Sequence, residues 1–175
     1  MVAPPTSGTR DAWNSLVMVK GCTKTAKSLY DAEGKKAKKE CAKIREDGYA
    51  VEAGENDTLI VQKLSSNPDA YGFFGYSYLV ANKDKIKASS INGVQPSLEG
   101  IQDYSYPIAR PLFFYVKKAH IGVIPGIKEF LKEFTSKKAM SNRGYLAEIG
   151  LVPLASDKYK VTRTAAVDLN TIKLK

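Results

Sequence analysis

The sequence lacks the residues that most catalytic and metal sites require. It contains one histidine, His120, and two cysteines, Cys22 and Cys41. Two thiols without companion ligands make a poor zinc site, and their spacing is not that of a Cys-x-x-Cys redox motif. Neither Gly-x-Ser-x-Gly nor His-Glu-x-x-His occurs, and no Gly-Lys-Ser/Thr follows the glycines near residue 122. We therefore predict a protein that is not an enzyme and that uses no metal and no cofactor.

Long hydrophobic runs are absent as well. No stretch of about 18 apolar residues occurs, so the sequence predicts no transmembrane helix. Residues 1–4, Met-Val-Ala-Pro, are not a signal peptide, because no apolar segment follows a basic one. Hydrophobic residues make up 43% of the chain and charged residues 26%, which is typical of a globular protein. A chain of 175 residues is long enough to bury one core of fair size.

Positive charge is in excess, with a net charge of +9, which favours anionic partners in general. The densest lysine cluster, residues 35–39, has no interleaved aromatic side chain on which a base could stack. It belongs to a Lys- and Ala-rich segment, residues 23–47, which predicts one or two exposed helices broken at Gly34. We interpret the cluster as a solvated helix face and expect no nucleic acid partner. The alternative is a basic interaction protein that binds nucleic acid or an anionic surface through Lys24, Lys27, Lys35, Lys36, Lys38 and Lys39.

Helical and strand-like patterns alternate along the rest of the chain, which indicates an α/β fold. The strongest strand signal covers residues 106–118. Its core, residues 111–116, is almost continuously apolar, as in a strand that is covered on both faces. Helices are expected over 8–20, 57–64, 125–134 and 144–149, and the tail 155–175 is amphipathic and lysine-rich. Further strands are expected over 49–53, 71–78 and, around Asn92-Gly93, 86–98.

The beginning of the first expected helix combines two hydroxyls, a glycine and an arginine in the run Ser7-Gly8-Thr9-Arg10. A helix N-terminus attracts anions because its first N–H groups are unpaired and its dipole is positive there. Gly8 lets the backbone approach a ligand closely, and both hydroxyls can donate hydrogen bonds. Arg10 can present a fork of N–H groups to a tetrahedral oxyanion. The run therefore predicts a phosphate site, and an ordinary helix N-cap is the alternative.

Four segments, in order along the chain, resemble the periplasmic phosphate-binding proteins of ABC transporters. The first resembles the SGTRDAF signature of the family, the second its NPGAIGYVGYSYL strand and turn, the third its YPLSRPLYIYVK strand and the last its PGVKEF helix. The resemblance implies a two-lobed periplasmic-binding-protein fold that binds inorganic phosphate for the membrane permease subunits of an ABC importer. The four segments are PPTSGTRDA at 4–12, NPDAYGFFGYSYL at 67–79, YPIARPLFFYVK at 106–117 and PGIKEF at 125–130.

The resemblance also implies how the chain is divided. Residues 1–105 correspond to the second lobe, incomplete at its start, and residues 106–175 return to a first lobe whose core the chain would lack. We expect a chain of this kind to bind phosphate weakly and to replace the missing lobe by self-association. The resemblance further implies a periplasmic location, with the signal peptide outside this chain.

The family resemblance assigns the phosphate ligands of this chain to Ser7, Gly8, Thr9 and Arg10. An arginine often stands four residues before the serine in the family, but Ala3 occupies that position here. Arg10 is expected to replace it. The carboxylate with which the family accepts a proton from phosphate would lie in the first lobe.

Cys22 and Cys41 form an isolated pair in a chain that resembles periplasmic proteins. A disulfide between them is therefore expected, since that compartment is oxidising. Closing a loop of this size would stabilise the fold by about 3 kcal/mol in the chain-entropy description. Two unrelated buried thiols are the alternative.

Overall fold

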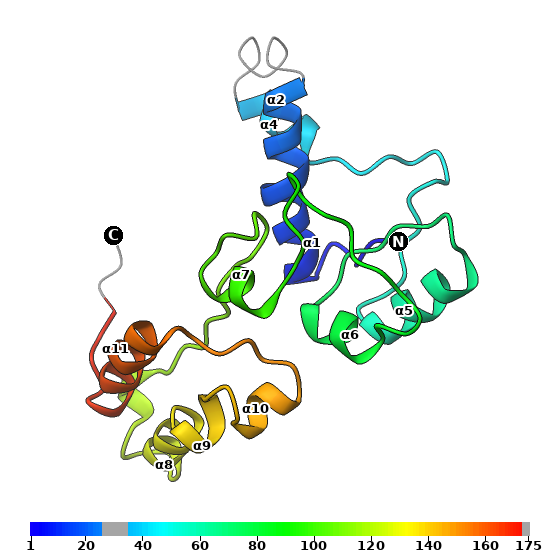
Figure 1. Ribbon diagram of the computed structural model, residues 1–175. Helices are drawn as coiled ribbons and strands as arrows, with labels where there is room; N and C mark the ends of the chain where they lie inside the picture. Colours follow the sequence, from blue (N-terminus) through cyan, green and yellow to red (C-terminus); the bar gives the residue numbers. More distant parts are fainter. Residues whose placement is uncertain (26–34, 173–175) are drawn as a thin grey trace. The chain divides into compact units, whose positions relative to one another are not determined.

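A computed structural model describes residues 1–25 and 35–172 of the chain (Figure 1). The chain divides into two units, Met1–Ser89 and Ser90–Lys175. Within the described residues, no helix combines the length and the apolar character that a membrane crossing requires. The division into lobes at residues 105 and 106 stays a prediction.

The first unit contains a helix that runs without a break from Gly8 to Thr25 and has a π-helical stretch in its middle. The helix begins where expected and extends beyond the predicted end at residue 20. Ser7 precedes it in extended conformation and caps its first turn. The helices of this unit are α1 (Gly8–Trp13), η1 (Asn14–Val19), α2 (Lys20–Thr25), α4 (Lys35–Cys41), α5 (Asp57–Ser66) and α6 (Tyr76–Ala81).

A short backbone pairing holds the N-terminal residues of the first unit. The N–H of Val2 donates to Val51 and the N–H of Ala53 donates to Val2, both at 2.9 Å. Val2, Ala3 and Ala53 are buried beside this pairing. It is an isolated parallel bridge, so the strand predicted over 49–53 is reduced to one bridging residue.

Helix α5 confirms the helix predicted over 57–64. The side chain of Asn56 caps it by accepting the N–H of Thr58 at 2.9 Å, and Ile60 is fully buried on its inner face. Gly72 packs so closely on this helix that a Cβ would lie 2.9 Å from Ile60 Cγ2.

The strand predicted over 71–78 is wrong. Residues 71–75 form a loop, and α6 begins at Tyr76. The N–H of Gly75 donates to the carboxylate of Asp57, the first residue of α5, at 3.2 Å. This backbone group is therefore bound by a helix residue and not by a neighbouring strand. A strand requires a partner for its backbone groups, and no described segment pairs with this one.

A disulfide joins Cys22 in α2 to Cys41 in α4, with the Cα atoms 5.8 Å apart. The predicted pairing is confirmed, and the alternative of two separate thiols is wrong. Helix α4 is one of the exposed helices expected within 23–47. The break expected at Gly34 lies outside the described residues.

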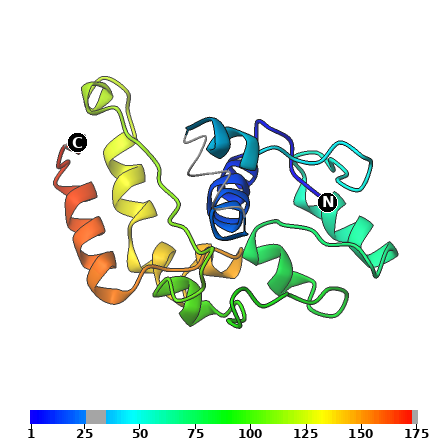
Figure 2. The same ribbon diagram turned by 90° about the horizontal axis from the view of Figure 1, so that it is seen from above.

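The second unit is built around two neighbouring helices, α8 and α11, which lie side by side in Figure 2. Leu131 and Thr135 are buried at the end of α8. The carbonyl of Thr135 accepts hydrogen bonds from Tyr159 Oη at 3.0 Å and Arg163 Nη1 at 2.6 Å, which attach α11 to it. The helices of this unit are α7 (Leu98–Gln102), η2 (Lys118–His120), α8 (Ile127–Phe134), α9 (Lys137–Met140), α10 (Tyr145–Glu148) and α11 (Ser156–Val167).

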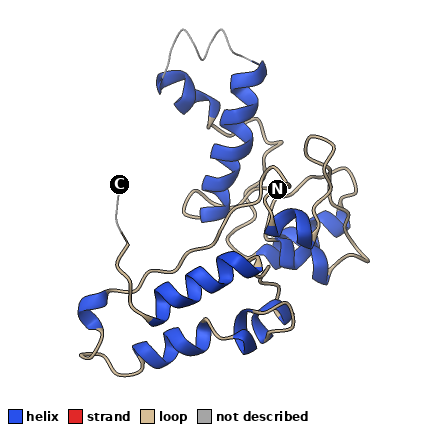
Figure 3. Ribbon diagram, turned by 60° about the vertical axis from the view of Figure 1, so that its left-hand side comes forward, coloured by secondary structure: helices blue, strands red, loops and turns tan. Residues whose placement is uncertain are grey.

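These elements confirm the helices predicted over 125–134 and 144–149, and α11 forms in the amphipathic tail. The strand predicted over 106–118 is wrong, because its apolar core is exposed to solvent and pairs with no strand. Figure 3 accordingly shows helices and loops in the described part of the chain, where β-pairing is limited to three isolated bridges. One of these, between Ile91 and Val94, is all that forms of the hairpin predicted around Asn92-Gly93.

The described residues therefore do not form the sheet that the α/β expectation requires. A strand pattern indicates that a segment could fit into a sheet. A sheet forms only where two such segments pair. In the second unit the apolar segment 111–116 meets helix α8 and no other extended segment.

Candidate anion-binding site

Ser7 closes the start of helix α1. Its backbone is extended, with φ −81° and ψ 130°, and its Oγ accepts the N–H of Thr9 at 3.2 Å. Ser7 is thus the N-cap of this helix, as the alternative interpretation predicted. A hydroxyl that accepts one hydrogen bond still has its own proton to donate, so capping leaves Ser7 able to bind an anion.

Gly8 leaves the helix start open on one side. A Cβ built on this residue would meet no atom within 4 Å outside its chain neighbours and the backbone of its own helix. Gly8 is the first residue of the helix, where backbone N–H groups have no intrahelical acceptor. Gly8 is also exposed, so an anion can approach the backbone from solvent on this side.

Arg10 is partly engaged and has no carboxylate partner among the residues that the structure describes. Its Nη1 donates to the carbonyl of Ala3 at 2.7 Å, and its Nε is buried without a hydrogen bond. One turn later on the same helix, the Oδ1 of Asn14 is also buried and unpaired. Buried polar atoms are normally hydrogen-bonded, so this face of the helix retains capacity for a polar ligand or water.

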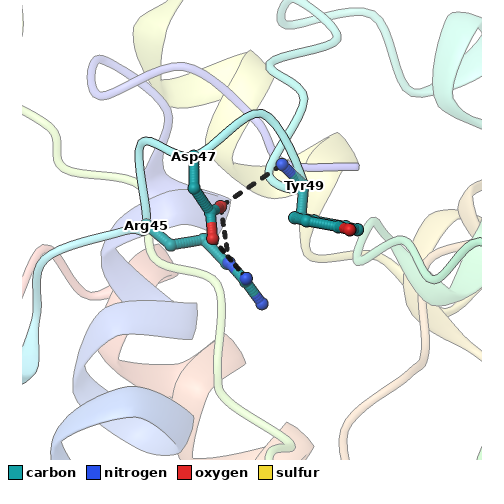
Figure 4. A network of polar contacts seen from close by, with 3 residues as sticks. All are labelled: Arg45, Asp47 and Tyr49. Carbon is teal, nitrogen blue, oxygen red and sulfur yellow. Dashed lines mark hydrogen bonds and ion pairs between the residues drawn. The ribbon is translucent and has the colours of Figure 1, made fainter.

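Arg45, the other arginine of the first unit, is paired with a carboxylate (Figure 4). Its Nε donates to Asp47 Oδ1 at 2.7 Å, its Nη2 pairs with Oδ2, and its guanidinium lies 4.7 Å from the centre of the Tyr49 ring. The hydrogen bond from Arg45 lowers the pKa of Asp47 below its ordinary value. Arg10 is therefore the arginine of this unit whose charge is not compensated by a carboxylate.

Glu55 lies next to the motif, which sequence reasoning did not anticipate. Its Oε1 accepts the hydroxyl of Thr6 at 2.6 Å, one residue before Ser7. The bridge between Val2 and Glu52 explains the proximity, because it runs the two segments in parallel. The contact joins residues 49 positions apart, so no local pattern could have revealed it.

An aromatic pair holds the helix of the site in place. The rings of Trp13 and Phe73 are stacked with their centroids 4.3 Å apart and their planes within 2° of parallel. Stacked aromatic pairs contribute about 0.5–1.5 kcal/mol beyond their buried area. The stack joins the residue directly after segment 4–12 to segment 67–79, and these are the first two segments that carried the family resemblance.

Five of the six lysines of the alternative interpretation lie on helices α2 and α4. Lys24, Lys38 and Lys39 are exposed. Lys35 and Lys36 belong to α4, and Lys27 lies outside the described residues. The disulfide ties the two helices together and so keeps the described lysines of this set on adjoining elements.

The arrangement at the helix start suits binding better than catalysis. It provides hydroxyl, backbone N–H and guanidinium donors around an open approach to the backbone. Among the residues that the structure describes, no group of His, Cys, Asp and Glu side chains could hold a metal ion. The site residues predicted from the sequence are contiguous, and the structure adds Glu55 and Asn14 to their surroundings.

Comparison with known protein families matches residues 1–138 to the PBP superfamily domain. The match covers well over half of the chain, so the chain belongs to this superfamily of periplasmic-binding proteins. The predicted fold family and the prediction of a binding protein rather than an enzyme are confirmed at the level of the family.

Several curated relatives are similar over the same length. The phosphate-binding protein PstS of Staphylococcus haemolyticus (strain JCSC1435) is 35% identical over 111 residues, which is 59% of this chain and 34% of the relative. PstS of Staphylococcus aureus (strain USA300) is 33% identical with the same coverage, and that of strain bovine RF122 / ET3-1 is 32% identical. The matched region thus spans about a third of these relatives. No solved structure matches the chain.

Proposed function

We propose that the chain binds inorganic phosphate at the start of helix α1, as the substrate-binding component of an ABC phosphate importer. The observation that carries the proposal is the open helix start with an arginine that lacks a carboxylate partner. It lies in the part of the chain that matches the superfamily domain, and the curated relatives are phosphate-binding proteins. The proposal includes a periplasmic location and transfer of the ligand to membrane permease subunits.

Each residue of the site has a separate role in this proposal. Ser7 donates its hydroxyl proton to a phosphate oxygen, and Thr9 donates its side-chain hydroxyl. Gly8 contributes its backbone N–H and the open approach. Arg10 supplies positive charge through the N–H groups that do not bond Ala3. The helix dipole adds to this charge, since its positive end lies at the same place.

We expect this chain alone to bind phosphate weakly. The donors lie on one side of the ligand, so an anion bound there stays partly hydrated and each hydrogen bond contributes only about 1 kcal/mol. Contacts from Arg10 add about 1.5–3 kcal/mol. Set against the cost of immobilising the ligand, the sum corresponds to a dissociation constant no tighter than roughly millimolar.

A first lobe closing over the ligand would change this affinity. In the proposal it supplies the carboxylate that accepts a proton from phosphate, and with it the discrimination against sulfate. The matched region spans about a third of the curated relatives, so the presence of such a lobe in the protein is itself part of the proposal. Self-association of the chain is the substitute expected in its absence.

Isothermal titration calorimetry tests the proposal. Phosphate is titrated into this chain and into a chimera that carries, ahead of Met1, the part of the Staphylococcus haemolyticus relative preceding its matched region. We expect weak binding by the chain and binding tighter by orders of magnitude in the chimera. Gly8→Val and Arg10→Ala should undo much of that gain, whereas Arg45→Ala serves as the matched arginine control.

Two results would contradict this account. Micromolar binding by the chain alone would show that one side of the ligand suffices. Full affinity of the chimera after Arg10→Ala would remove the role proposed for that residue.

The second candidate function is binding of a polyanion through the lysines of α2 and α4. The disulfide favours it, because it holds the two basic helices together. Salt separates the two functions. Polyanion binding weakens steeply with salt because bound counterions are released. Phosphate binding at the helix start should depend less on salt and should require Thr9 and Arg10.

A further inference from the structure

Two buried side-chain atoms on one helix have no hydrogen-bond partner among the described residues. They are the Nε of Arg10 and the Oδ1 of Asn14. An unpaired polar atom that is buried costs stability, so two of them on the same helix need an explanation. Asn14 is also the first residue of the π-helical stretch η1, and such stretches are frequent at functional sites.

The two side chains are placed so that each can reach the other. The N–H of Asn14 donates to the carbonyl of Arg10, so the turn between them is α-helical. Residues four apart in an α-helix share one face, with Cβ atoms about 5–6 Å apart. Because every Cα–Cβ bond leans towards the helix N-terminus, Asn14 leans towards Arg10 and Arg10 leans towards the helix start. Nε–H is a donor and the amide oxygen is an acceptor, so each atom offers what the other lacks.

The far end of the Arg10 side chain is already held at the helix start. Its Nη1 donates to the carbonyl of Ala3 at 2.7 Å, and Ala3 is itself buried. A guanidinium is planar and its N–H groups stand in a fixed arrangement. One hydrogen bond still allows the plane to turn, whereas a second bond at Nε sets the direction of the remaining N–H groups.

The paired arginine of the first unit shows why the acceptor should be an amide. The Nε of Arg45 donates to Asp47 at 2.7 Å, which fixes the guanidinium but also compensates its charge (Figure 4). An arginine that attracts an anion has to keep its charge. The amide oxygen of Asn14 is neutral, so it can hold the Nε of Arg10 without reducing the attraction for the anion.

We infer that Asn14 is a positioning residue of the phosphate site, an inference that rests on the proposed function. When phosphate binds at the helix start, the Oδ1 of Asn14 accepts the Nε–H of Arg10 and directs the remaining N–H groups of the guanidinium to the anion. Asn14 lies a turn further along the helix and acts through Arg10. Because the structure shows this bond unmade, forming it adds to the affinity for phosphate.

The arginine Nε–H signals of the ¹⁵N-labelled chain test the inference. Inorganic phosphate is added until the amide shifts of Gly8 and Thr9 are complete. The Nε–H signal of Arg10, assigned by its absence in Arg10→Lys, should then shift and exchange more slowly with water. In Asn14→Leu the amides should still shift at higher phosphate concentration, whereas the Nε–H signal of Arg10 should not move.

Two comparisons show whether the signal reports this hydrogen bond. The Nε–H signal of Arg45 should not respond to phosphate, because its bond to Asp47 is present without the ligand. Asn14→Asp keeps an acceptor oxygen in the same place and adds charge. It should therefore move the Nε–H signal of Arg10 before any phosphate is added.

Affinities from the same titrations measure the contribution of the bond. Asn14→Leu should weaken phosphate binding about 3- to 10-fold, as expected for one hydrogen bond. The variant Arg10→Lys has no Nε–H, so adding Asn14→Leu to it should cause no further loss.

Urea unfolding without phosphate separates positioning from a structural role. Asn14→Leu removes a buried amide oxygen that is unpaired, so the variant should be at least as stable as the unmodified chain. The matched control is Asn56→Leu, because the Oδ1 of Asn56 accepts the N–H of Thr58 at 2.9 Å. This control should lose stability.

The outcomes distinguish the inference from the proposed function. The inference alone is wrong if phosphate shifts the amides of Gly8 and Thr9 while the Nε–H signal of Arg10 stays fixed, or moves equally in Asn14→Leu. It is also wrong if Asn14→Leu weakens binding equally in the Arg10→Lys background, or loses as much stability as Asn56→Leu. If phosphate shifts neither amide, the proposed function fails and the inference fails with it.

Discussion

Two regions of this chain expose backbone polar groups, and they differ in what surrounds those groups. At the start of α1 the free groups are N–H donors only, next to hydroxyls and an arginine without a carboxylate. In residues 111–116 both N–H and C=O groups are free, and the neighbouring side chains are apolar. The first arrangement suits the small anion that we propose, and the second is typical of a strand without its partner. The chemistry of a binding partner thus follows from which backbone groups are free and from the polarity around them.

The largest effect that separates the two regions is expected from Arg10→Ala. Loss of a charge-assisted contact of about 1.5–3 kcal/mol should weaken phosphate binding about 10- to 100-fold in the chimera. Arg45→Ala is the control, because Arg45 is committed to Asp47. Calorimetry measures both, and an equal loss in the two variants would show that general charge, rather than this site, attracts phosphate.

The converse change acts on the second region. Phe114→Ala removes a ring that packs on Phe134 and Phe130. Because Phe114 is 43% exposed, the cost should be about 2 kcal/mol in the free energy of unfolding, less than for a fully buried ring. Urea unfolding of the two variants Phe114→Ala and Phe114→Leu measures it, and the leucine variant should lose less. Phosphate affinity should stay unchanged, and a loss of it would mean that the two regions are coupled.

Ser7→Ala separates the capping role from the ligand role at the helix start. Losing the bond to the N–H of Thr9 should cost about 1 kcal/mol in the free energy of unfolding. Ser97, whose Oγ accepts the N–H of Gly100 at 3.0 Å at the start of α7, is a matched control. Ser97→Ala should cost a similar amount of stability, and only Ser7→Ala should also weaken phosphate binding. Equal phosphate affinity in both would leave Ser7 as a cap alone.

The smallest expected effect is an acid-dependent one at Asp47. The Arg45 hydrogen bond lowers the pKa of this carboxyl in the folded state. The stabilisation is therefore present above the ordinary Asp pKa of about 3.9 and is lost as the pH falls through the lower folded value. Both side chains are exposed, so the change in stability should be slight. A carboxyl-carbon NMR titration should show the pKa of Asp47 rising towards its ordinary value in Arg45→Gln, and an unchanged pKa would show that the pair is not formed in solution.

The features that could be predicted from the sequence are those that depend on neighbouring residues. Ser7 and Asn56 cap the helices that follow them, and both helices begin where the pattern indicated. The predicted strands over 71–78 and 106–118 failed because a strand depends on a partner that the pattern does not name. The proximity of Glu55 to Thr6 was missed for the same reason, since it arises from a pairing across 49 positions.

The measurement that tests the central claim most directly is a phosphate titration of the ¹⁵N-labelled chain followed by amide NMR shifts. Binding at the helix start predicts shifts concentrated at Gly8, Thr9 and Arg10, with millimolar saturation and none in residues 111–117. The Gly8→Val variant, whose Cβ has free space in the unliganded protein, should keep its fold and lose these shifts. Shifts centred on Lys24, Lys38 and Lys39 that vanish with added salt, or no shifts at all, would contradict the account.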